Sequence, residues 1–267
     1  MEDLIGQGRT ADVFRYGESK VIKVFHDEFD WLAYEEYVKV KIIDNVGVPA
    51  PKVYGFADAD GNKGIVYEYV QGISMFNLMQ RYPLKVARYA KRLADLHATI
   101  HKKTLCSLPN IKESLLEAIQ TVQSITQVEK DAIISYMDTL PDGYSLCHYD
   151  FHPDNVLLQN GDAKVIDWMT AGAGDPCVDV CRTSVILNSN TLPPNVSAMK
   201  EILTNTFRKI FYRSYIHQYL KVTGTTQQNV NKWLLPVAAA RLAEGIESEI
   251  PYLNGIIAKK MSEYGLC

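Results

Sequence analysis

Residues with the chemistry of phosphate transfer cluster in the middle of the sequence, between His148 and Asn155. This segment has a histidine two residues before Asp150 and an asparagine five residues after it. A carboxylate so placed can accept a hydrogen bond from an attacking hydroxyl, while a neutral side-chain oxygen a few residues on can coordinate Mg²⁺. The apolar run Val156–Leu158 indicates a strand that would hold both groups firmly. We therefore expect Asp150 to be a catalytic base and Asn155 a metal ligand.

A second carboxylate, Asp167, stands directly after the apolar run Ala163–Ile166. A carboxylate at the end of such a strand can bind a Mg²⁺ ion that bridges the phosphates of a nucleotide. Gly161-Asp162 reads as the turn of a hairpin, which would bring Asn155 and Asp167 to the same end. Either aspartate alone is more typical of a turn or a helix cap. The three groups at this spacing favour convergence of Asp150, Asn155 and Asp167 on one divalent ion.

The N-terminal segment from Gly6 to Val13 matches the pattern G-x-G-x-x-G-x-V, with Ala11 in place of the third glycine. Glycines allow backbone amides to approach phosphate oxygens because no Cβ stands in the way. A dinucleotide-binding loop would need a strand before the glycines and a helix after them. Only five residues precede Gly6, and strand-forming residues follow. We therefore set that alternative aside and expect Gly6 and Gly8 to contact nucleotide phosphates.

Lys23 stands inside the apolar run Val21–Phe25, which indicates a strand. A lone lysine in a strand usually lies on a solvated face. After a glycine-rich hairpin, however, it is where a cation would neutralise the α- and β-phosphates. The helix that follows should supply a carboxylate as its partner. We expect this partner to be Glu36, with Glu35 as the close alternative, because a shift of one residue would exchange the two.

The end of the β-rich region, Glu68-Tyr69-Val70, lies just before Gly72. A nucleotide-binding hinge would present backbone groups at such a place to the edge of the base. We expect the C=O of Glu68 and the N–H of Val70 to hydrogen-bond adenine. This prediction depends on position alone, because side chains do not report a backbone contact.

Together these motifs resemble those of the aminoglycoside phosphotransferase/choline kinase-like superfamily, a branch of the protein-kinase-like fold. The resemblance covers nearly the whole chain and is most specific from His148 to Asp179. The roles that it implies are a catalytic base, two magnesium ligands and a phosphate-binding lysine, namely Asp150, Asn155, Asp167 and Lys23.

The resemblance also implies that Asp175 and Asp179 brace the segment after Asp167. The residues themselves indicate instead the first turn of a helix, with Asp175 as a cap beside Pro176. Upstream, His97 lies in a segment that looks like the family's helix leading into the second lobe. A histidine on such an apolar face is more typical of a hydrogen-bonded core residue than of a catalytic one.

The expected fold is α+β and two-lobed, with a small β-rich lobe over residues 1–70 and a larger helical lobe over 71–267. The first would bind the nucleotide, and the second would carry the catalytic loop, the metal site and the acceptor-binding helices. Hydrophobic spacing and turn residues predict the following elements. They are strands at 13–16, 20–25, 52–56 and 65–70, and helices at 29–45, 84–103, 111–126, 129–139 and through most of 177–267.

Composition narrows the function classes further. The 267 residues include 28 Lys plus Arg and 31 Asp plus Glu, a formal charge of −3, which disfavours a dedicated nucleic-acid or membrane-surface binder. The sequence has neither an apparent signal peptide nor an apolar run of about 18 residues. Five cysteines without a C-x-x-C pair suggest reduced thiols. We expect a cytoplasmic protein that binds neither nucleic acid nor membranes.

The expected activity is an ATP- and Mg²⁺-dependent phosphotransferase that acts on a hydroxyl of a small molecule, with GTP as an alternative donor. Two rival functions are a nucleotide-binding pseudoenzyme and an atypical protein kinase. The presence of Lys23, Asp150 and Asp167 argues against the first. Protein kinases place lysine two residues after the catalytic aspartate, where this chain has His152, and close their activation loop with A-P-E, which the sequence lacks.

The acceptor is left open among aminoglycosides, choline-like alcohols, sugars and amino-acid hydroxyls. The segment Arg241–Glu249 offers carboxylates that could bind a cationic amine, although a solvated helix face explains them as well. Trp233 and Tyr252 could enclose a quaternary ammonium by cation–π contact, with core packing as the more ordinary interpretation.

Overall fold

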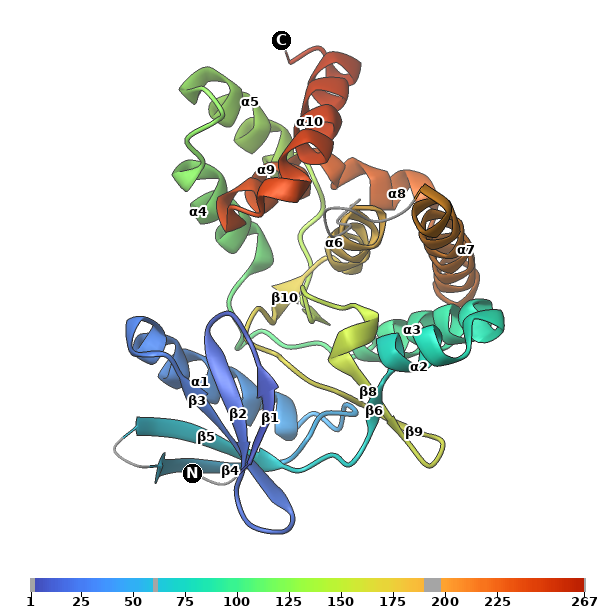
Figure 1. The fold of residues 1–267 in the computed structure, drawn as a ribbon. Helices are drawn as coiled ribbons and strands as arrows, with labels where there is room; N and C mark the ends of the chain where they lie inside the picture. Colours follow the sequence, from blue (N-terminus) through green and yellow to red (C-terminus); the bar gives the residue numbers. More distant parts are fainter. Residues whose placement is uncertain (1–2, 60–61, 190–197, 267) are drawn as a thin grey trace. The chain divides into compact units, whose positions relative to one another are not determined.

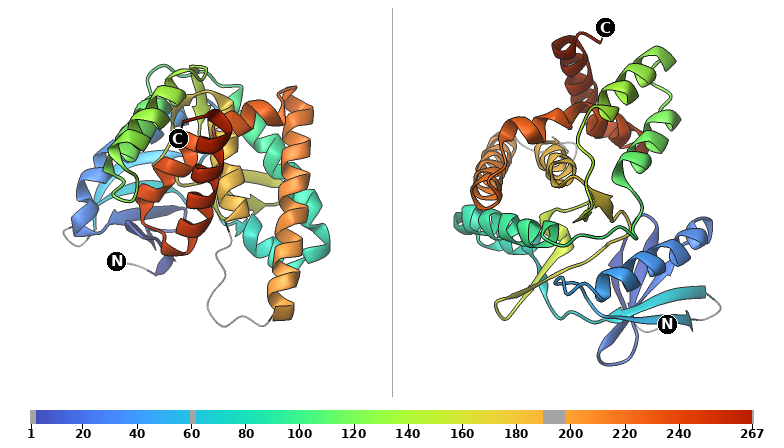
Figure 2. Two further views of the ribbon diagram at one scale, coloured as in Figure 1. Left: turned by 90° about the horizontal axis from the view of Figure 1, so that it is seen from above. Right: turned by 180° about the vertical axis from the view of Figure 1, so that it is seen from behind.

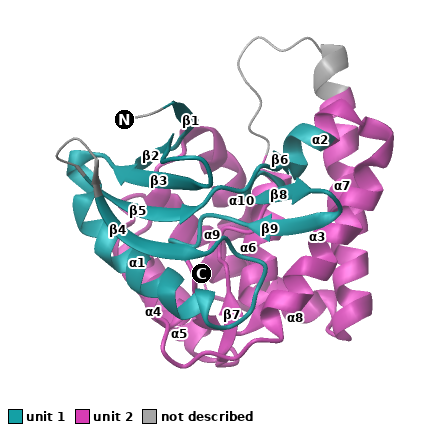
Figure 3. Cartoon of the chain, turned by 90° about the horizontal axis from the view of Figure 1, so that it is seen from below, with its two compact units in different colours: residues 1–78, 153–170 teal, residues 79–152, 171–267 magenta. Residues whose placement is uncertain are grey.

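The computed structural model describes residues 3–59, 62–189 and 198–266 of the protein. The chain divides into two compact units, coloured separately in Figure 3. Unit 1 consists of residues 1–78 together with 153–170, and unit 2 consists of residues 79–152 and 171–267. Residues 153–170, which contain Asn155 and Asp167, therefore fold with the N-terminal part of the chain.

Unit 1 is built around an antiparallel sheet of five strands in the order β1-β2-β3-β5-β4. Its core is formed by apolar side chains that alternate along the strands, with Ile22, Val24 and Val66 at the centre. Gly17, with φ of +73°, turns the chain between β2 and β3. The strands are β1 (Leu4–Gln7), β2 (Ala11–Arg15), β3 (Lys20–Phe25), β4 (Val53–Ala59) and β5 (Asn62–Glu68).

One helix, α1 (Asp30–Asp44), packs against strands β3, β4 and β5 of this sheet. Its buried positions are Ala33, Glu36, Val40 and Ile43, which recur at helical spacing and so form one face. Three of the four are apolar. A glutamate on the buried face of a helix requires a partner within the fold.

A second sheet in unit 1 joins the strands in the order β6-β8-β9. The turn between β8 and β9 consists of Asn160 and Gly161, both with positive φ, at 49° and 96°. Asn-Gly is the pair that two-residue hairpin turns favour, so the turn lies one residue earlier than the predicted Gly161-Asp162. The strands are β6 (Ile73–Ser74), β8 (Val156–Gln159) and β9 (Asp162–Val165).

Unit 2 is mainly helical, with one short antiparallel pair of strands, β7 (Ser145–Cys147) and β10 (Gly172–Gly174). Helices α3 and α7 lie side by side in Figures 1 and 2. Its largest fully buried side chains include Trp233, Tyr215, Tyr219 and Phe151. The helices are α3 (Val86–His101), α4 (Ile111–Thr121), α5 (Gln127–Asp138), α6 (Pro176–Asn188), α7 (Ala198–Thr223), α8 (Gln227–Lys232), α9 (Leu234–Arg241) and α10 (Ile250–Tyr264); α2 (Met75–Arg81) spans the division between the units.

The α+β class predicted from the sequence is confirmed, and most element ends agree within a few residues. The predicted helix over 111–126 is too long, because α4 stops at Thr121 and Val122 is extended. Thr126 instead caps α5 in a reciprocal arrangement with Glu129, each side chain bonded to the other residue's backbone. Within the described ranges, none of the helices has the length and apolar character that crossing a bilayer demands.

Candidate functional site

In unit 1, Asn155 and Asp167 lie at the same end of the β8–β9 hairpin. The ladder pairs Val156 with Val165, and the backbone N–H of Ile166 donates to the C=O of Asn155 at 2.9 Å. Asp167 follows immediately and adopts a left-handed conformation with φ of +63°. Non-glycine residues adopt this conformation rarely, and more often at functional sites than elsewhere. The hairpin thus produces the juxtaposition that the sequence predicted for these two oxygen donors.

Lys23 on β3 connects this end of the hairpin to helix α1. Its Nζ lies 2.7 Å from Oε2 of Glu36 and 3.1 Å from Oδ1 of Asp167. Burial alone would lower the pKa of Lys23, but the charges and hydrogen bonds of Glu36 and Asp167 outweigh it and raise the pKa. The hydroxyl of Tyr67 donates to the other oxygen of Glu36 at 2.7 Å. Lys23 is therefore a charged group held in one place.

The choice between Glu35 and Glu36 is decided by which face of α1 each residue occupies. Glu36 is 2% exposed and pairs with Lys23, whereas Glu35 is exposed on the outer face. The apolar residues Ala33 and Val40, three before and four after Glu36, set this orientation. The sequence contained this signal, because only Glu36 continues the buried helical spacing.

The donor set at this end of the hairpin suits magnesium. Mg²⁺ prefers oxygen ligands and is commonly held by one or two protein groups together with phosphate oxygens. The Asn155 side chain is buried, and the Asp167 carboxylate is 42% exposed while it contacts Lys23. The cation at 3.1 Å keeps that carboxylate next to the place where phosphate charge would be neutralised. The two residues fit the predicted metal role, which stays a prediction.

Of the two N-terminal glycines, only Gly8 is required by the surrounding backbone. Its N–H donates to the C=O of Ala11 at 2.9 Å, and a Cβ at this position would lie 3.0 Å from the same oxygen. A Cβ on Gly6 would make only ordinary contacts with Val13 on the paired strand. Gly8 therefore forms the tight turn between β1 and β2, and phosphate contact by Gly6 and Gly8 stays a prediction.

The predicted hinge residues lie at the end of β5. The side chain of Glu68 accepts from the backbone N–H of Lys52 at 3.1 Å and from Lys164 Nζ at 3.2 Å. Burial alone would raise the pKa of Glu68, but these contacts lower it. The side chain thus secures the strand end, and the backbone groups of Glu68 and Val70 keep their predicted role in base recognition.

In unit 2, Asp150 lies close to two cationic or potentially cationic groups. Its Oδ2 is 3.5 Å from Nε2 of His152, and its side chain is 29% exposed. Burial would raise the pKa of Asp150, but the hydrogen bond and charge of His152, followed by the charge of Arg182, hold it well below the usual value. The carboxylate is therefore ionised at neutral pH and able to accept a hydrogen bond from a hydroxyl.

One face of helix α6 holds the backbone on both sides of Asp150. Asp179, Arg182 and Thr183 lie three and four residues apart and so point in the same direction. The Asp179 carboxylate accepts from the N–H groups of His148 and Tyr149, at 2.6 and 3.1 Å. Arg182 Nε donates to the C=O of Tyr149 at 2.8 Å, and the Thr183 hydroxyl donates to the C=O of Phe151 at 2.9 Å. These four hydrogen bonds fix the segment from 148 to 151.

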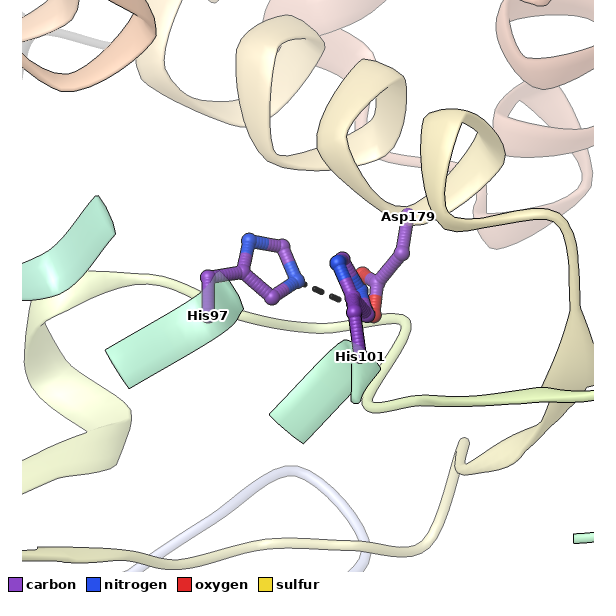
Figure 4. Close-up of side chains that lie close together, drawn as sticks. All are labelled: His97, His101 and Asp179. Carbon is purple, nitrogen blue, oxygen red and sulfur yellow. Dashed lines mark hydrogen bonds and ion pairs between the residues drawn. The ribbon is translucent and has the colours of Figure 1, made fainter. Parts of the chain in front are cut away.

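Behind this face, Asp179 lies at the centre of a fully buried cluster with His97 and His101 (Figure 4). Its Oδ2 is 3.2 Å from His101 Nε2 and 3.1 Å from His97 Nε2, the latter poorly aligned for a hydrogen bond. Nδ1 of His97 lies 2.7 Å from the hydroxyl of Tyr215, and Nδ1 of His101 lies 2.7 Å from the hydroxyl of Tyr219.

Two histidines and an aspartate can also bind a transition metal. Oδ2 of Asp179, however, already accepts from the backbone N–H of His148 and lies within reach of both imidazoles. We therefore interpret the cluster as a hydrogen-bonded brace. His97 is a core histidine, in keeping with the sequence-based interpretation.

The roles of Asp175 and Asp179 differ from each other. Asp175 caps helix α6, because its Oδ1 accepts from the N–H of Cys177 at 2.6 Å and Pro176 occupies the first turn. This confirms the interpretation made from the residues alone. Asp179 holds residues 148 and 149 before the predicted base. Its role toward the segment after Asp167, which the family resemblance implied, stays a prediction.

Sequence reasoning did not identify Arg182, Thr183 and His152 as neighbours of Asp150. The spacing of Asp179, Arg182 and Thr183 in one predicted helix was a usable signal, since three polar residues on one helix face within an apolar segment need partners. What the spacing could not reveal is which distant segment supplies those partners.

Two of the three carboxylates in the segment Arg241–Glu249 form ion pairs within unit 2. Glu249 is buried and forms two hydrogen bonds with Arg241, and Glu244 lies between Arg182 and Arg241. Trp233 is 1% exposed, so for this residue the core-packing interpretation is confirmed. Glu244 and Glu249 are therefore already paired with arginines, whereas Glu247 is exposed.

The family and the fold can be identified by comparison. A model described as the phosphotransferase enzyme family matches residues 4–219, and no curated protein matches the sequence. The ternary complex of APH(2'')-IIa with streptomycin and ATP is 16% identical, with a TM-score of 0.60 over 96% of this chain and 90% of that one. A thermostable mutant of APH(4)-Ia with ADP and hygromycin B is 16% identical, with a TM-score of 0.62 over 96% and 92%.

A choline/ethanolamine kinase family protein from Mesorhizobium loti is also 16% identical, with a TM-score of 0.51 over 96% of this chain and 85% of that one. At such identities these structures establish a shared fold, the protein-kinase-like one that the motifs predicted. Because the family model covers most of the sequence, the chain belongs to the phosphotransferase enzyme family.

Proposed function

We propose that the protein is an ATP- and Mg²⁺-dependent phosphotransferase that moves the γ-phosphate to a hydroxyl of a small molecule. The observation that carries this proposal is the contact of Lys23 with both Glu36 and Asp167 in unit 1. A lysine fixed between a buried glutamate and a metal-binding aspartate is the arrangement that orients nucleotide phosphates in kinase-like sites.

The proposed roles follow from the residue chemistry. Asp150 accepts the proton of the attacking hydroxyl, and its lowered pKa supports an ionised carboxylate at neutral pH. Asn155 and Asp167 would hold Mg²⁺, which when bound offsets charge on the phosphates. Lys23 orients the phosphates, and the nucleotide is bound along residues 1–70 through the groups named above, Gly6, Gly8, Glu68 and Val70. Residues 71–267 would receive the acceptor.

The acceptor class is suggested by the structures of similar fold. Their names include streptomycin, hygromycin B and choline or ethanolamine kinases, so aminoglycosides, choline-like alcohols and sugar alcohols are the acceptors to test. ATP is the expected donor, with GTP as the alternative. The absence of an A-P-E segment from the sequence disfavours a protein acceptor. We place the enzyme in the cytoplasm as part of the same proposal.

ADP release in the presence of a panel of small alcohols and aminoglycosides tests the proposal. We expect one acceptor class to stimulate release, and Asp150→Ala to lose about 10²- to 10⁴-fold in turnover while it still binds nucleotide. Turnover of Asp150→Ala at the wild-type rate would refute the role of Asp150. Transfer of labelled phosphate to protein would favour a protein kinase, and nucleotide binding without any turnover would favour a pseudoenzyme.

A further inference from the structure

Tyr149, the residue before Asp150, adopts a backbone conformation that requires support. Its φ is +61°, in the left-handed region that residues other than glycine, asparagine and aspartate seldom occupy. Its side chain is buried, and the Arg182 guanidinium lies 4.7 Å from its ring centroid. Arg182 Nε also donates to its C=O. Arg182 thus contacts both the ring and the carbonyl of Tyr149, the residue whose backbone leads into Asp150.

Arg182 is held in turn by a chain of charges that ends in the C-terminal part of the sequence. Its Nη2 donates to Oε1 of Glu244 at 2.5 Å, and Oε2 of Glu244 accepts from Nη1 of Arg241 at 3.1 Å. Arg241 forms two further hydrogen bonds with Glu249, at 2.5 and 2.8 Å. The successive contacts therefore lead from Glu249 to Arg241, Glu244, Arg182 and finally Tyr149. The charges alternate in sign along this chain until it reaches the backbone of residue 149.

Most of these charged side chains are buried, which restricts them to one arrangement. Arg182, Arg241 and Glu249 are each no more than 6% exposed. A buried guanidinium that loses one of its partners retains an uncompensated charge, so each member fixes its neighbour. The charge of Arg182 also contributes to the low pKa of Asp150. Glu244 is the only one of the four charged residues that lies at the border of the interior, with 27% of its side chain exposed.

The family model ends at residue 219, whereas three of the four charged members of the chain lie between 241 and 249. The segment after the matched region therefore reaches back to the catalytic loop. We infer that Arg182 and Glu244 are positioning residues for Asp150, and that residues 241–249 support the loop that carries this carboxylate. This inference assumes the proposed phosphotransferase activity, in which Asp150 is the base.

Glu244→Gln tests the inference with little change in shape. Glutamine has one acceptor oxygen, so it can accept from Arg182 or from Arg241 but would present its NH₂ group to the other. We expect kcat for ADP release to fall about tenfold while KM for ATP stays within about twofold, because the change affects orientation of the base and not nucleotide binding. Glu244→Asp, which keeps the charge, should retain more of the activity than Glu244→Gln.

Glu263→Gln is the matched control, because Glu263 also pairs with a cationic side chain, Lys260, but is itself exposed on a helix surface. It should leave both constants unchanged. An equal effect of both substitutions, or a Glu244→Gln enzyme with wild-type kcat, would overturn the inference. So would a rise in KM for ATP as large as the fall in kcat.

Amide hydrogen exchange supplies a readout that does not depend on an acceptor. Glu244→Gln should accelerate exchange over residues 147–152 and leave the helices α4 and α5 as protected as in the wild type. Unchanged exchange in 147–152, or faster exchange through the whole of unit 2, would overturn the positioning role. If no acceptor supports turnover, the proposed function fails while this measurement still decides whether Glu244 and Arg182 order the loop.

Discussion

Oδ2 of Asp179 lies 2.6 Å from the backbone nitrogen of His148, two residues before Asp150. The other carboxylate oxygen accepts from the next N–H group in the chain, that of Tyr149. Burial would raise the pKa of Asp179, but the charges and hydrogen bonds of His97 and His101 keep it well below the usual value. A buried anion thus serves as the fixed point to which the predicted catalytic loop is attached.

Asp179→Asn should destabilise the protein strongly. Asparagine would replace one acceptor oxygen by an NH₂ group that faces donors, which leaves buried polar groups unsatisfied. We expect a loss of about 3–5 kcal/mol in the free energy of unfolding, measured by urea denaturation. Asp95→Asn is the control, because Asp95 is exposed and accepts a hydrogen bond from Gln218. Similar stabilities for the two variants would contradict the central role of Asp179.

Glu36→Gln should weaken the positioning of Lys23. The substitution removes the negative charge 2.7 Å from the Lys23 ammonium while it preserves the size of the side chain. We expect kcat/KM for ATP to fall at least about tenfold, since a charge-assisted hydrogen bond contributes more than a neutral one. Glu35→Gln alters an exposed neighbour on the same helix and should behave like the wild type. Equal losses in both variants would show that the pairing in the structure is not the functional one.

Much of this arrangement was predictable from local sequence patterns. The exception is the grouping of Asn155 and Asp167 with Lys23 in unit 1, because we expected both residues in the lobe over 71–267. The N-terminal hairpin, the helix after it and the β8–β9 hairpin do follow from hydrophobic spacing and turn residues. Even Glu36 could be distinguished from Glu35 by the helical spacing from Ala33 to Val40. Each of these features is encoded within about 20 residues.

The contacts that hold Tyr149 in place were not predictable in the same way. Arg182 contacts a backbone carbonyl 33 residues earlier and a carboxylate 62 residues later in the sequence. Such contacts depend on how helices α6 and α9 pack, and no local pattern specifies that packing. The sequence showed charged residues in Arg241–Glu249, but a solvated face and a buried network have the same composition.

Asp167→Ala should remove the dependence of nucleotide binding on magnesium. The Asp167 carboxylate is part-exposed and offers an oxygen ligand next to Lys23, whereas Lys23 would keep Glu36 as its partner after the substitution. We expect ATP to bind equally with Mg²⁺ and with EDTA in this variant, as measured by calorimetry. Asp162→Ala, at the other end of the same hairpin, should retain the wild-type response to Mg²⁺. A retained magnesium effect in Asp167→Ala would contradict the metal role.

The acid sensitivity of the protein should depend on His97. Burial, followed by the charge of His101, outweighs the attraction of Asp179 and lowers the pKa of His97 to about 4. An imidazole whose pKa falls on folding binds more protons in the unfolded chain between about pH 6.5 and 4, so stability decreases as the pH falls through this range. Asp179, whose pKa is also lowered by folding, adds to the loss only below about pH 4.

Urea unfolding at pH 7 and pH 4.5, in the wild type and in variants, separates the contribution of His97 from that of the other titrating groups. Charging the buried imidazole should cost the wild type about 2–3 kcal/mol between these two values, and His97→Gln should lack this part of the pH dependence. His217→Gln, on the exposed face of α7, should retain it. Since the group that titrates also faces the carboxylate that holds His148, loss of activity on acidification should parallel the loss of stability. Identical pH dependence in His97→Gln and the wild type would show that another group carries the effect.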